Sequence, residues 1–209
     1  AHLREDRRHI VDDDIERLMT EIDLPLNFEM AATDEMREIA LRHRPHAACI
    51  VPEKREELTT EGGLDAVRGH NHLGPVVGDL SAAGIRVSLF IDPEKEQLDA
   101  AVSLGAPVVE LHTGTYCEAA DPAARAAELE RIEMAAAYGE AIGLECHAGH
   151  GLSFDTVKPI AAIPTIAELN IGHFLIGEAI FGGLTDAVIL MRGLMDEARA
   201  ARSDAGSSE

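Results

Sequence analysis

The chain has 209 residues and a formal net charge of −20 at pH 7, and 46% of its residues are hydrophobic. A chain of this length can bury a sizeable core in one domain. The strong negative charge argues against nucleic acid or an anionic membrane as a partner, because phosphate-rich surfaces would repel the protein. A local group of Arg or His side chains can still bind a small phosphorylated molecule.

The cysteines and the apolar runs give an expectation about the compartment. Cys49, Cys117 and Cys146 form an odd, widely spaced set, which is typical of free thiols in a reducing compartment. No apolar run approaches the roughly 18 to 20 residues of a membrane span. The N-terminus is charged from Arg4 onward, which does not fit a signal peptide. We therefore expect a cytoplasmic protein.

Short apolar runs predict strands that alternate with helices along the chain. The predicted strands cover residues 24–30, 46–51, 86–91, 108–112, 143–148 and 166–171, and residues 1–4 resemble the tail of a further strand. The predicted helices cover residues 12–21, 33–42, 76–83, 93–104, 121–142, 154–162 and 177–201. Thr33 is a predicted N-cap, and Gly105 is a predicted helix end. Residues 53–63 predict a long polar loop, and residues 64–75 predict a loop or a frayed helix.

This alternation predicts the fold class. Strands and helices at spacings of roughly 20 to 40 residues favour parallel strands with right-handed crossovers. The predicted strands favour an α/β fold of the (β/α)8 TIM barrel type, here lacking the first strand and helix. An open doubly wound sheet is the runner-up, but no Gly-x-Gly-x-x-Gly motif follows a strand. We expect one N-terminally incomplete barrel domain over residues 1–202 and a polar disordered tail over residues 203–209.

Three of the predicted strand ends carry imidazoles, carboxylates and glycines. A β/α barrel builds its active site at the C-terminal ends of its strands, so these segments are candidates for one site. Glu110 and His112 alternate and therefore share a face of their strand. Gly172 and His173 precede a helix, and backbone N–H groups at a helix N-terminus can bind phosphate, although a plain turn is the alternative. The three segments are residues 110–114, 145–152 and 168–173.

The N-terminal segment and the strand near residue 29 carry further candidates. His2 and Arg4 alternate, and an imidazole beside a guanidinium suits a phosphorylated or enolisable substrate. The alternative is a solvated, self-paired charge cluster. Glu29 ends an apolar strand, where burial would raise its pKa toward the range of a general base. A structural ion pair with an Arg is the alternative for Glu29.

A second function class uses the later strands. Glu110, His112, His147 and His150 could hold a metal ion in a barrel hydrolase or aldolase. However, no His-x-His ends an early strand, and the spacing matches no tight metal motif. Cys146 is expected to be a buried thiol. Lys54 is expected to be a paired or solvated ammonium, which disfavours a Schiff-base role.

Several long motifs in order resemble those of pyridoxine 5′-phosphate synthases, and the resemblance runs from Ala1 to about Arg199. It implies a (β/α)8 barrel transferase that condenses 1-deoxy-D-xylulose 5-phosphate with 3-amino-2-oxopropyl phosphate and releases phosphate and water. The amine comes from the substrate, so no catalytic lysine is needed. Proton shuttles suffice, with no metal or organic cofactor. The motifs are residues 2–9, 27–31, 51–65, 87–92, 110–114, 147–152 and 168–173.

The resemblance also implies roles for single residues, carried over by motif position. His2 and Glu29 would accept protons, His150 would donate one, and Glu110 would stabilise charged intermediates. The residues implied to bind the pentulose phosphate are Arg4, His9 and Thr59, and those implied to bind the amino-ketone phosphate are Gly151, Gly172 and His173. By family analogy, the chain is also expected to form a homo-oligomer, a multimer of dimers.

One departure from the family pattern concerns the start of the sequence. The family's first strand carries an Asn and an Asp-His pair, followed by an Arg, and none of these is present here. We therefore expect that the first β/α unit is absent and that two sheet edges stay open, which is a stability liability. The chain as it stands is expected to be weakly active or inactive. A third alternative is a non-catalytic fragment that survives only as a subunit of an assembly.

Overall fold

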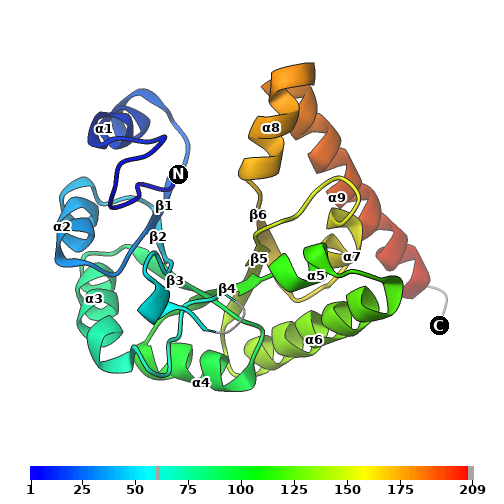
Figure 1. Ribbon diagram of the computed structural model, residues 1–209, viewed down its shortest axis with the longest axis horizontal. Helices are drawn as coiled ribbons and strands as arrows, with labels where there is room; N and C mark the ends of the chain where they lie inside the picture. The colour runs from blue at the N-terminus through cyan, green and yellow to red at the C-terminus, as the bar shows by residue number, and fades with distance from the viewer. Residues whose placement is uncertain (60–61, 207–209) are drawn as a thin grey trace. The chain divides into compact units, whose positions relative to one another are not determined.

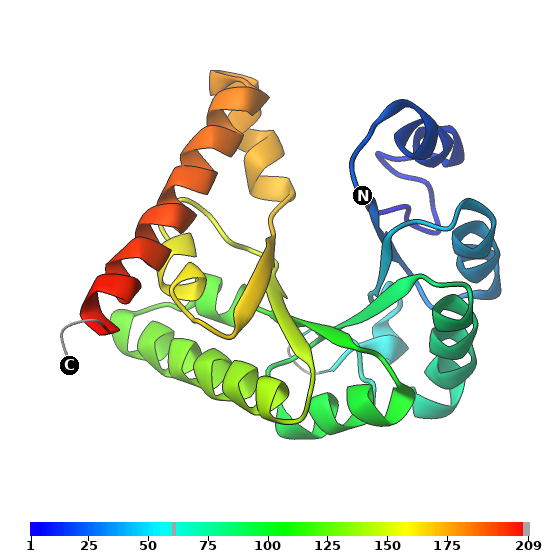
Figure 2. The same cartoon turned by 180° about the vertical axis from the view of Figure 1, so that it is seen from behind.

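A computed structural model describes residues 1–59 and 62–206 and shows an α/β chain in which parallel strands alternate with helices (Figures 1 and 2). The chain forms two compact units. The first unit contains residues 1–110 and 141–144, and the second contains residues 111–140 and the chain from residue 145 onward. No helix of the described chain is long and apolar enough to cross a membrane. The expectation of a single domain over residues 1–202 stays a prediction.

The first unit contains the parallel strands β1 (Asn27–Met30), β2 (Ala47–Ile50) and β3 (Arg86–Ile91), paired in that order. Strand β4 (Val108–His112) follows β3 in the sheet and is divided between the two units. Their register aligns Glu29 with Cys49, and Cys49 with Ser88. Side chains in register on parallel strands point to the same face of the sheet. A row of polar side chains therefore crosses this face.

The helices of the first unit follow the predicted pattern in most places. They are α1 (Asp12–Glu21), α2 (Asp34–His43), the short 3-10 helix η1 (Arg55–Glu57), α3 (His70–Ala82) and α4 (Lys95–Leu104). The N-cap prediction is confirmed, because the Thr33 hydroxyl accepts a hydrogen bond of 3.3 Å from the Met36 N–H. The predicted helix end is also confirmed, because Gly105 has φ of +81° and caps α4 in the left-handed conformation.

Helix α3 differs from the prediction, which placed residues 64–75 in a loop or frayed helix and began the helix at residue 76. The helix begins at His70 and contains Pro75. Proline removes one backbone donor from a helix interior, and this cost argues against a helix on propensity alone. Here the stripe formed by Leu73, Val76, Val77 and Leu80 is buried. Tertiary burial therefore outweighs local propensity.

The second unit contains the parallel pair β5 (Glu145–Gly149) and β6 (Ile166–Asn170). Its helices include α5 (Gly114–Glu118), which has no periodic signal in the sequence and was not predicted. Helix α9 packs against α7 and α8 (Figure 1). The remaining helices are α6 (Pro122–Ala141), α7 (Val157–Ala161), α8 (His173–Gly182) and α9 (Leu184–Gly206).

The closing helices differ from the predicted range of 177–201 at both ends. Helix α8 already begins at His173, and α9 continues to Gly206. Gly183, with φ of +91°, separates the two helices. The tail predicted for residues 203–209 thus begins inside α9, and residues 207–209 lie outside the described residues.

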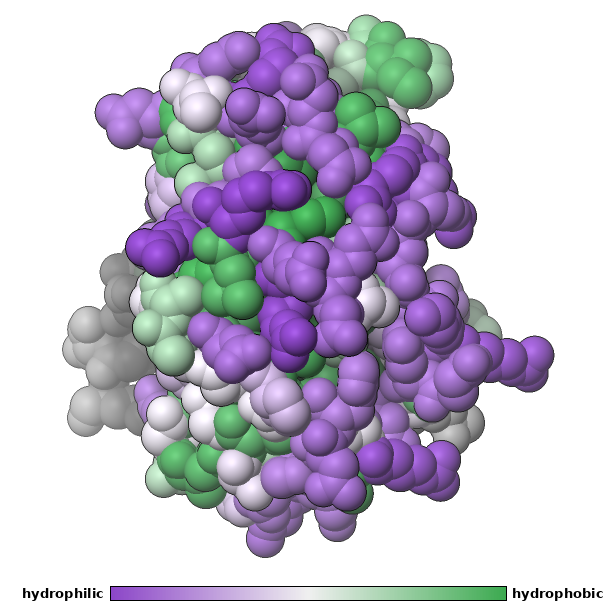
Figure 3. All heavy atoms as spheres, turned by 90° about the vertical axis from the view of Figure 1, so that its left-hand side faces the viewer, coloured by the Kyte–Doolittle hydropathy of each residue, from purple (hydrophilic) through white to green (hydrophobic). Residues whose placement is uncertain are grey.

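The exposed side chains differ in polarity from one part of the chain to another. The face in Figure 3 is largely hydrophilic, with apolar side chains in small groups. Helices α8 and α9 expose large apolar side chains, and Phe181 (90% exposed) and Ile180 (78%) are the most exposed of these. Large exposed apolar side chains on neighbouring helices are candidates for an interaction site.

Substitution of Leu80 tests the packing of α3 onto β3. Leu80 is fully buried, and removal of three side-chain carbons leaves a cavity that its neighbours fill only in part. We expect Leu80→Ala to lower the free energy of unfolding by about 2–5 kcal/mol, measured by urea denaturation. The control is Val102→Ala on α4, whose side chain is 45% exposed, and a change there as large as that of Leu80→Ala would contradict the assignment.

Candidate functional site

In the first unit, His2 lies between two carboxylates. Its Nδ1 is 2.9 Å from Glu29 Oε1, and its Nε2 is 2.9 Å from Glu53 Oε1. The backbone holds this arrangement, because the Leu3 N–H donates to the Glu29 carbonyl and the Glu29 N–H donates to the Ala1 carbonyl. These bonds extend the sheet beyond β1 as a parallel bridge between His2 and Glu29. Two residues predicted from separate motifs are thus in direct contact.

The charge state of Glu29 corrects the sequence-based prediction. Burial disfavours the charged carboxylate, but the hydrogen bond from His2 and the positive charges of His2 and Arg4 outweigh burial, so the pKa of Glu29 lies below its ordinary value. The prediction of a raised pKa is therefore wrong, because it counted burial and not the imidazole. At neutral pH Glu29 is ionised, which is the state that a proton acceptor needs.

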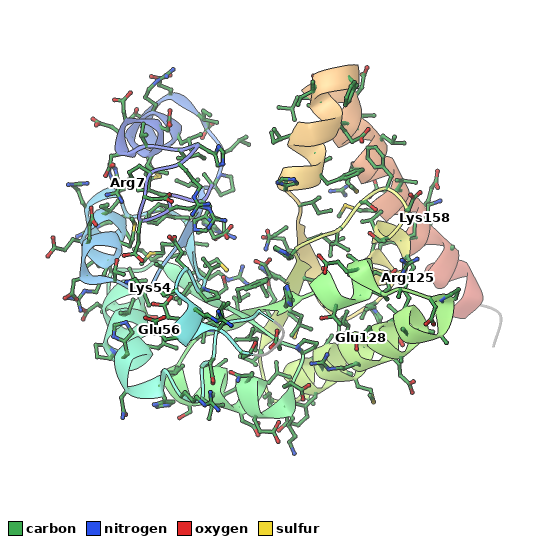
Figure 4. The ribbon with its side chains drawn as sticks, viewed as in Figure 1. Arg7, Lys54, Glu56, Arg125, Glu128 and Lys158 are labelled. Carbon is green, nitrogen blue, oxygen red and sulfur yellow. The ribbon has the colours of Figure 1, made fainter. Side chains whose placement is uncertain are left out.

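The charged segment after His2 is folded around Arg7. The Arg7 guanidinium donates to Asp12 of α1 at 2.7 Å, to Glu35 of α2, and to the carbonyls of Arg4 and Glu5 (Figure 4). This segment turns sharply, since Arg7 and His9 have φ of +57° and +70°.

The charged and imidazole side chains near Arg7 in the sequence differ in whether they form ion pairs. Arg8 pairs with Asp6 at 2.8 Å, so the alternative of a self-paired cluster holds for this part of the segment. Within the described residues, no hydrogen bond or ion pair engages the Arg4 guanidinium. The His9 side chain is exposed. Arg4 and His9, two of the residues predicted to bind the pentulose phosphate, are therefore not committed to internal ion pairs.

Thr59 is tied to the C-terminal end of β3. Its Oγ1 hydrogen-bonds the Asp92 carboxylate and lies 3.3 Å from the Gly63 carbonyl. The Gly63 N–H donates to Asp92 Oδ1 at 3.1 Å. A Cβ at Gly63 would lie 2.5 Å from the Asp92 backbone nitrogen, so only glycine fits there. Asp92, which is 3% exposed, therefore positions the Thr59 hydroxyl.

Glu110 is 8% exposed and contacts the thiol of Cys49. Cys49 Sγ donates to Glu110 Oε2 at 3.6 Å. Burial, followed by the charge of Glu110, raises the pKa of Cys49 well above its ordinary value. The thiol therefore stays protonated and can donate. Ser88, in register with Cys49, also hydrogen-bonds this thiol.

In the second unit, two imidazoles lie together. The rings of His112 and His150 are 5.0 Å apart between centroids. A Cβ at Gly114 would lie 2.7 Å from His112 Nε2, so glycine leaves room for this ring pair. His150 is exposed and has φ of +78°. The buried Thr113 hydroxyl contacts the carbonyls of Gly149 (2.7 Å) and His150 (2.6 Å) and fixes the turn.

The three residues predicted to bind the amino-ketone phosphate lie at two turns of the second unit. Gly151 has φ of +81°, and a Cβ there would lie 3.1 Å from the Cys117 Cβ. Gly172 is the N-cap of α8, and His173 is its first residue. Both are exposed. The first N–H groups of a helix lack partners within the helix, so this end is chemically suited to an anion.

Among the ligand-type residues of the later strands, His147 lies between two glutamates. His147 is 4% exposed, and its Nε2 lies 2.8 Å from Glu145 Oε1 while its Nδ1 lies 3.6 Å from Glu168 Oε1. Among the described residues, no group of three or more His, Cys, Asp or Glu side chains could hold a metal ion. The alternative of a metal-dependent hydrolase or aldolase using Glu110, His112, His147 and His150 therefore gains no support.

The two plainer predictions for Cys146 and Lys54 are confirmed. Cys146 is 1% exposed, and burial raises its pKa to about 11. Lys54 pairs with Glu5 at 3.3 Å. A buried thiol and a paired ammonium are poor nucleophiles.

Sequence reasoning missed three residues that hold the candidates in place, namely Glu53, Asp92 and Thr113. Each lies within three residues of the end of a strand, which is a detectable signal. Glu53 falls within the predicted polar loop of residues 53–63, and Asp92 and Thr113 fall within the motifs of residues 87–92 and 110–114.

Known proteins are similar to this chain over almost its whole length. The sequence profile of the family described as pyridoxal phosphate biosynthesis protein PdxJ matches residues 1–197. A Rhodospirillum rubrum protein named pyridoxine 5′-phosphate synthase is 70% identical over 198 residues, which are 95% of this chain and 80% of that protein. A Ruegeria pomeroyi protein of the same name is 61% identical over 203 residues, covering 96% and 82% of the two chains.

A solved structure is similar in fold alone. In the crystal structure of the Amycolatopsis orientalis BexX/CysO complex, one chain matches with a TM-score of 0.57 and 16% identity, over 96% of this chain and 78% of that chain. The profile match and the two relatives are decisive for the family. The chain belongs to the family of pyridoxal phosphate biosynthesis protein PdxJ.

Proposed function

We propose that the chain is a pyridoxine 5′-phosphate synthase. It condenses 1-deoxy-D-xylulose 5-phosphate with 3-amino-2-oxopropyl phosphate by acid/base catalysis and releases phosphate and water. The observation that carries the proposal is the contact between His2 and Glu29, two proton-accepting groups 2.9 Å apart, in a chain 70% identical to a protein of that name. Imine formation, dehydration and ring closure all require proton transfer, and general acid–base groups supply it.

In the first unit, His2 and the ionised Glu29 accept protons. Arg4 and His9 bind the phosphate of the pentulose, since a guanidinium and an imidazole are both suitable donors to a dianion. The Thr59 hydroxyl, held by Asp92, contacts the same substrate. Glu110 stabilises the positively charged intermediates, because a buried carboxylate interacts strongly with a nearby cation.

In the second unit, His150 donates a proton to a leaving oxygen. The Thr113 hydroxyl fixes its carbonyl, and the positive φ of His150 sets the direction of the ring. Gly151, Gly172 and His173 bind the amino-ketone phosphate. Support comes from the N-terminus of α8, where backbone N–H groups and the helix dipole favour an anion.

The proposal also covers the type of barrel, the class of substrate and the cellular compartment. The fold is of the (β/α)8 barrel type, the substrates are phosphorylated small molecules, and the protein works in the cytoplasm. None of the proposed steps uses a metal or an organic cofactor. Each variant below is compared with the unmodified chain in the same incubation.

Glu29→Gln tests the proton-accepting role. The amide cannot take a proton at neutral pH, so we expect kcat to fall by about 10²–10⁴-fold. Product formation is followed by chromatography of pyridoxine 5′-phosphate together with released phosphate. Glu38→Gln on α2, an exposed carboxylate of the same unit, should leave the rate unchanged. A Glu29→Gln variant with the unmodified rate would end this assignment.

Arg4→Gln tests the phosphate contact. A charge-assisted hydrogen bond contributes about 1.5–3 kcal/mol, so we expect the KM for 1-deoxy-D-xylulose 5-phosphate to rise by about 10- to 100-fold. The KM for the amino-ketone phosphate should change little. The control is Arg8→Gln, whose side chain is 60% exposed and pairs with Asp6. An equal rise in both KM values would argue against this specific contact.

The proposal also includes a homo-oligomer, with a second copy of the chain covering the apolar side chains of α8 and α9. Phe181→Asp places a charge where the side chain is 90% exposed, and a charge is costly to bury without a partner. We expect light scattering to show a smaller species for this variant. Met134→Asp on α6, at a side chain 60% exposed, is the matched control. Equal sizes for all three proteins would contradict the assignment of this interface.

A further inference from the structure

Glu53 is a buried carboxylate that no step of the proposed chemistry uses. It follows β2, and its side chain is 9% exposed. Its Oε1 is 2.9 Å from His2 Nε2, and its Oε2 accepts a hydrogen bond of 3.0 Å from the Glu5 N–H. The Glu53 N–H donates to Glu57 Oε2 at 2.9 Å, which fixes the start of the loop. Both carboxylate oxygens and the backbone are therefore engaged, and the side chain has little freedom.

These contacts determine which nitrogen of His2 carries a proton. An ionised carboxylate only accepts hydrogen bonds, so a hydrogen bond between Glu53 and Nε2 requires a proton on Nε2. The second nitrogen, Nδ1, lies 2.9 Å from Glu29 and donates to it while the ring carries both protons. In the neutral ring the remaining proton stays on Nε2, because the Glu53 side chain is 9% exposed and needs a donor more than the Glu29 side chain, which is 44% exposed and can be solvated by water. A carboxylate that fixes the tautomer and orientation of a catalytic imidazole is a recurring arrangement in enzymes.

We propose that Glu53 is a positioning residue, which holds the Nε2 proton of His2 and so presents Nδ1 to Glu29 and the reacting molecule. The inference rests on the proposed function, because it gives Glu53 a purpose in the same proton transfer. When a substrate C–H or N–H bond breaks, its electron pair stays on the substrate and its proton goes to the His2–Glu29 pair. The proton on Nε2 does not move.

The neighbouring contacts favour Glu53 over the other charges of its loop. Lys54 pairs with Glu5 at 3.3 Å but is 50% exposed, and exposed pairs contribute little (Figure 4). Glu56 is exposed and lies on η1 (Figure 4). Glu53 is the buried member of this set, and its bonds to His2 and Glu5 join the loop after β2 to the N-terminal segment.

The test reads the tautomer of His2 directly. Nitrogen-15 NMR of the His2 ring, assigned with a His2→Gln variant, reports which nitrogen carries the proton and does not require turnover. In the unmodified chain we expect a protonated Nε2. In Glu53→Ala the neutral ring should shift to the Nδ1–H form, which can still donate to Glu29. Glu53→Gln keeps an acceptor oxygen and should restore the Nε2–H form, and Glu56→Gln should match the unmodified chain.

Kinetics give the second readout. A misoriented base lowers the rate without weakening substrate binding, so for Glu53→Ala we expect kcat to fall by about 10- to 100-fold with both KM values within about twofold. Glu53→Gln should recover most of this loss, and Glu56→Gln should show none. If Glu53→Gln recovers kcat, the hydrogen bond that positions His2 is what matters and the negative charge is not. Unchanged KM values would show that Glu53→Ala has not lost its structure in general.

The outcomes decide between the inference and the function. A ring that carries its proton only on Nδ1 in the unmodified chain overturns the inference, and this measurement holds even if Glu53→Ala does not fold. An unchanged ring spectrum and unchanged kcat in Glu53→Ala would also overturn it. If the unmodified chain and a longer relative both make no pyridoxine 5′-phosphate, the proposed function fails, while the ring spectra still decide the role of Glu53.

Discussion

A single imidazole joined to two carboxylates connects the N-terminal segment to β1 and to the loop after β2. His2 has one partner on β1 and one in the loop after β2, so three separate stretches of sequence meet at one ring. The two carboxylates differ in burial, because the Glu53 side chain is 9% exposed and the Glu29 side chain 44% exposed, so Glu53 depends more on the imidazole as a donor. The lowered pKa of Glu29 follows directly from this contact. The loop containing Thr59 starts near Glu53, and Asp92 anchors its Thr59 and Gly63 end separately.

A row of side chains in register on β1, β2 and β3 includes Glu29. The sheet itself, and not a loop, sets the positions of these side chains. Glu29, Cys49 and Ser88 occupy matching positions on β1, β2 and β3. Because parallel strands align their side chains in layers, a single register sets the direction of all three. Cys49 then contacts Glu110 on β4. The second unit uses a different device, in which a buried threonine hydroxyl, Thr113, holds the carbonyls of a tight turn.

Much of the fold was predictable because local rules agreed with burial. The Thr33 cap and the Gly105 end were confirmed, and so was the strand-to-helix alternation. The misses have separate causes. Pro75 and the glycines hid the start of α3, whose stability comes from the burial of Leu73 and Leu80. Helix α5 is too short to show a hydrophobic period.

The residue types of the candidate site were predictable from the sequence, but the contacts between these residues were less so. Strand ends identified His2, Glu29, Glu110 and His150, because reactive groups gather there in parallel α/β folds. Sequence could not pair His2 with Glu53, since the two lie 51 positions apart. The sign of the Glu29 pKa shift depends on another long-range contact, that between His2 and Glu29, which composition and periodicity do not encode.

The buried thiols have a consequence for the chemical durability of the protein. Burial raises the pKa of Cys49, Cys117 and Cys146, so each is almost entirely in the unreactive protonated form at neutral pH. Oxidants and alkylating reagents attack the thiolate, and they must wait for the surrounding structure to open before Cys49 or Cys146 can react. The cysteine sulfurs thus pack in the interior and act as weak hydrogen-bond donors. Their reaction with a thiol reagent would report local unfolding.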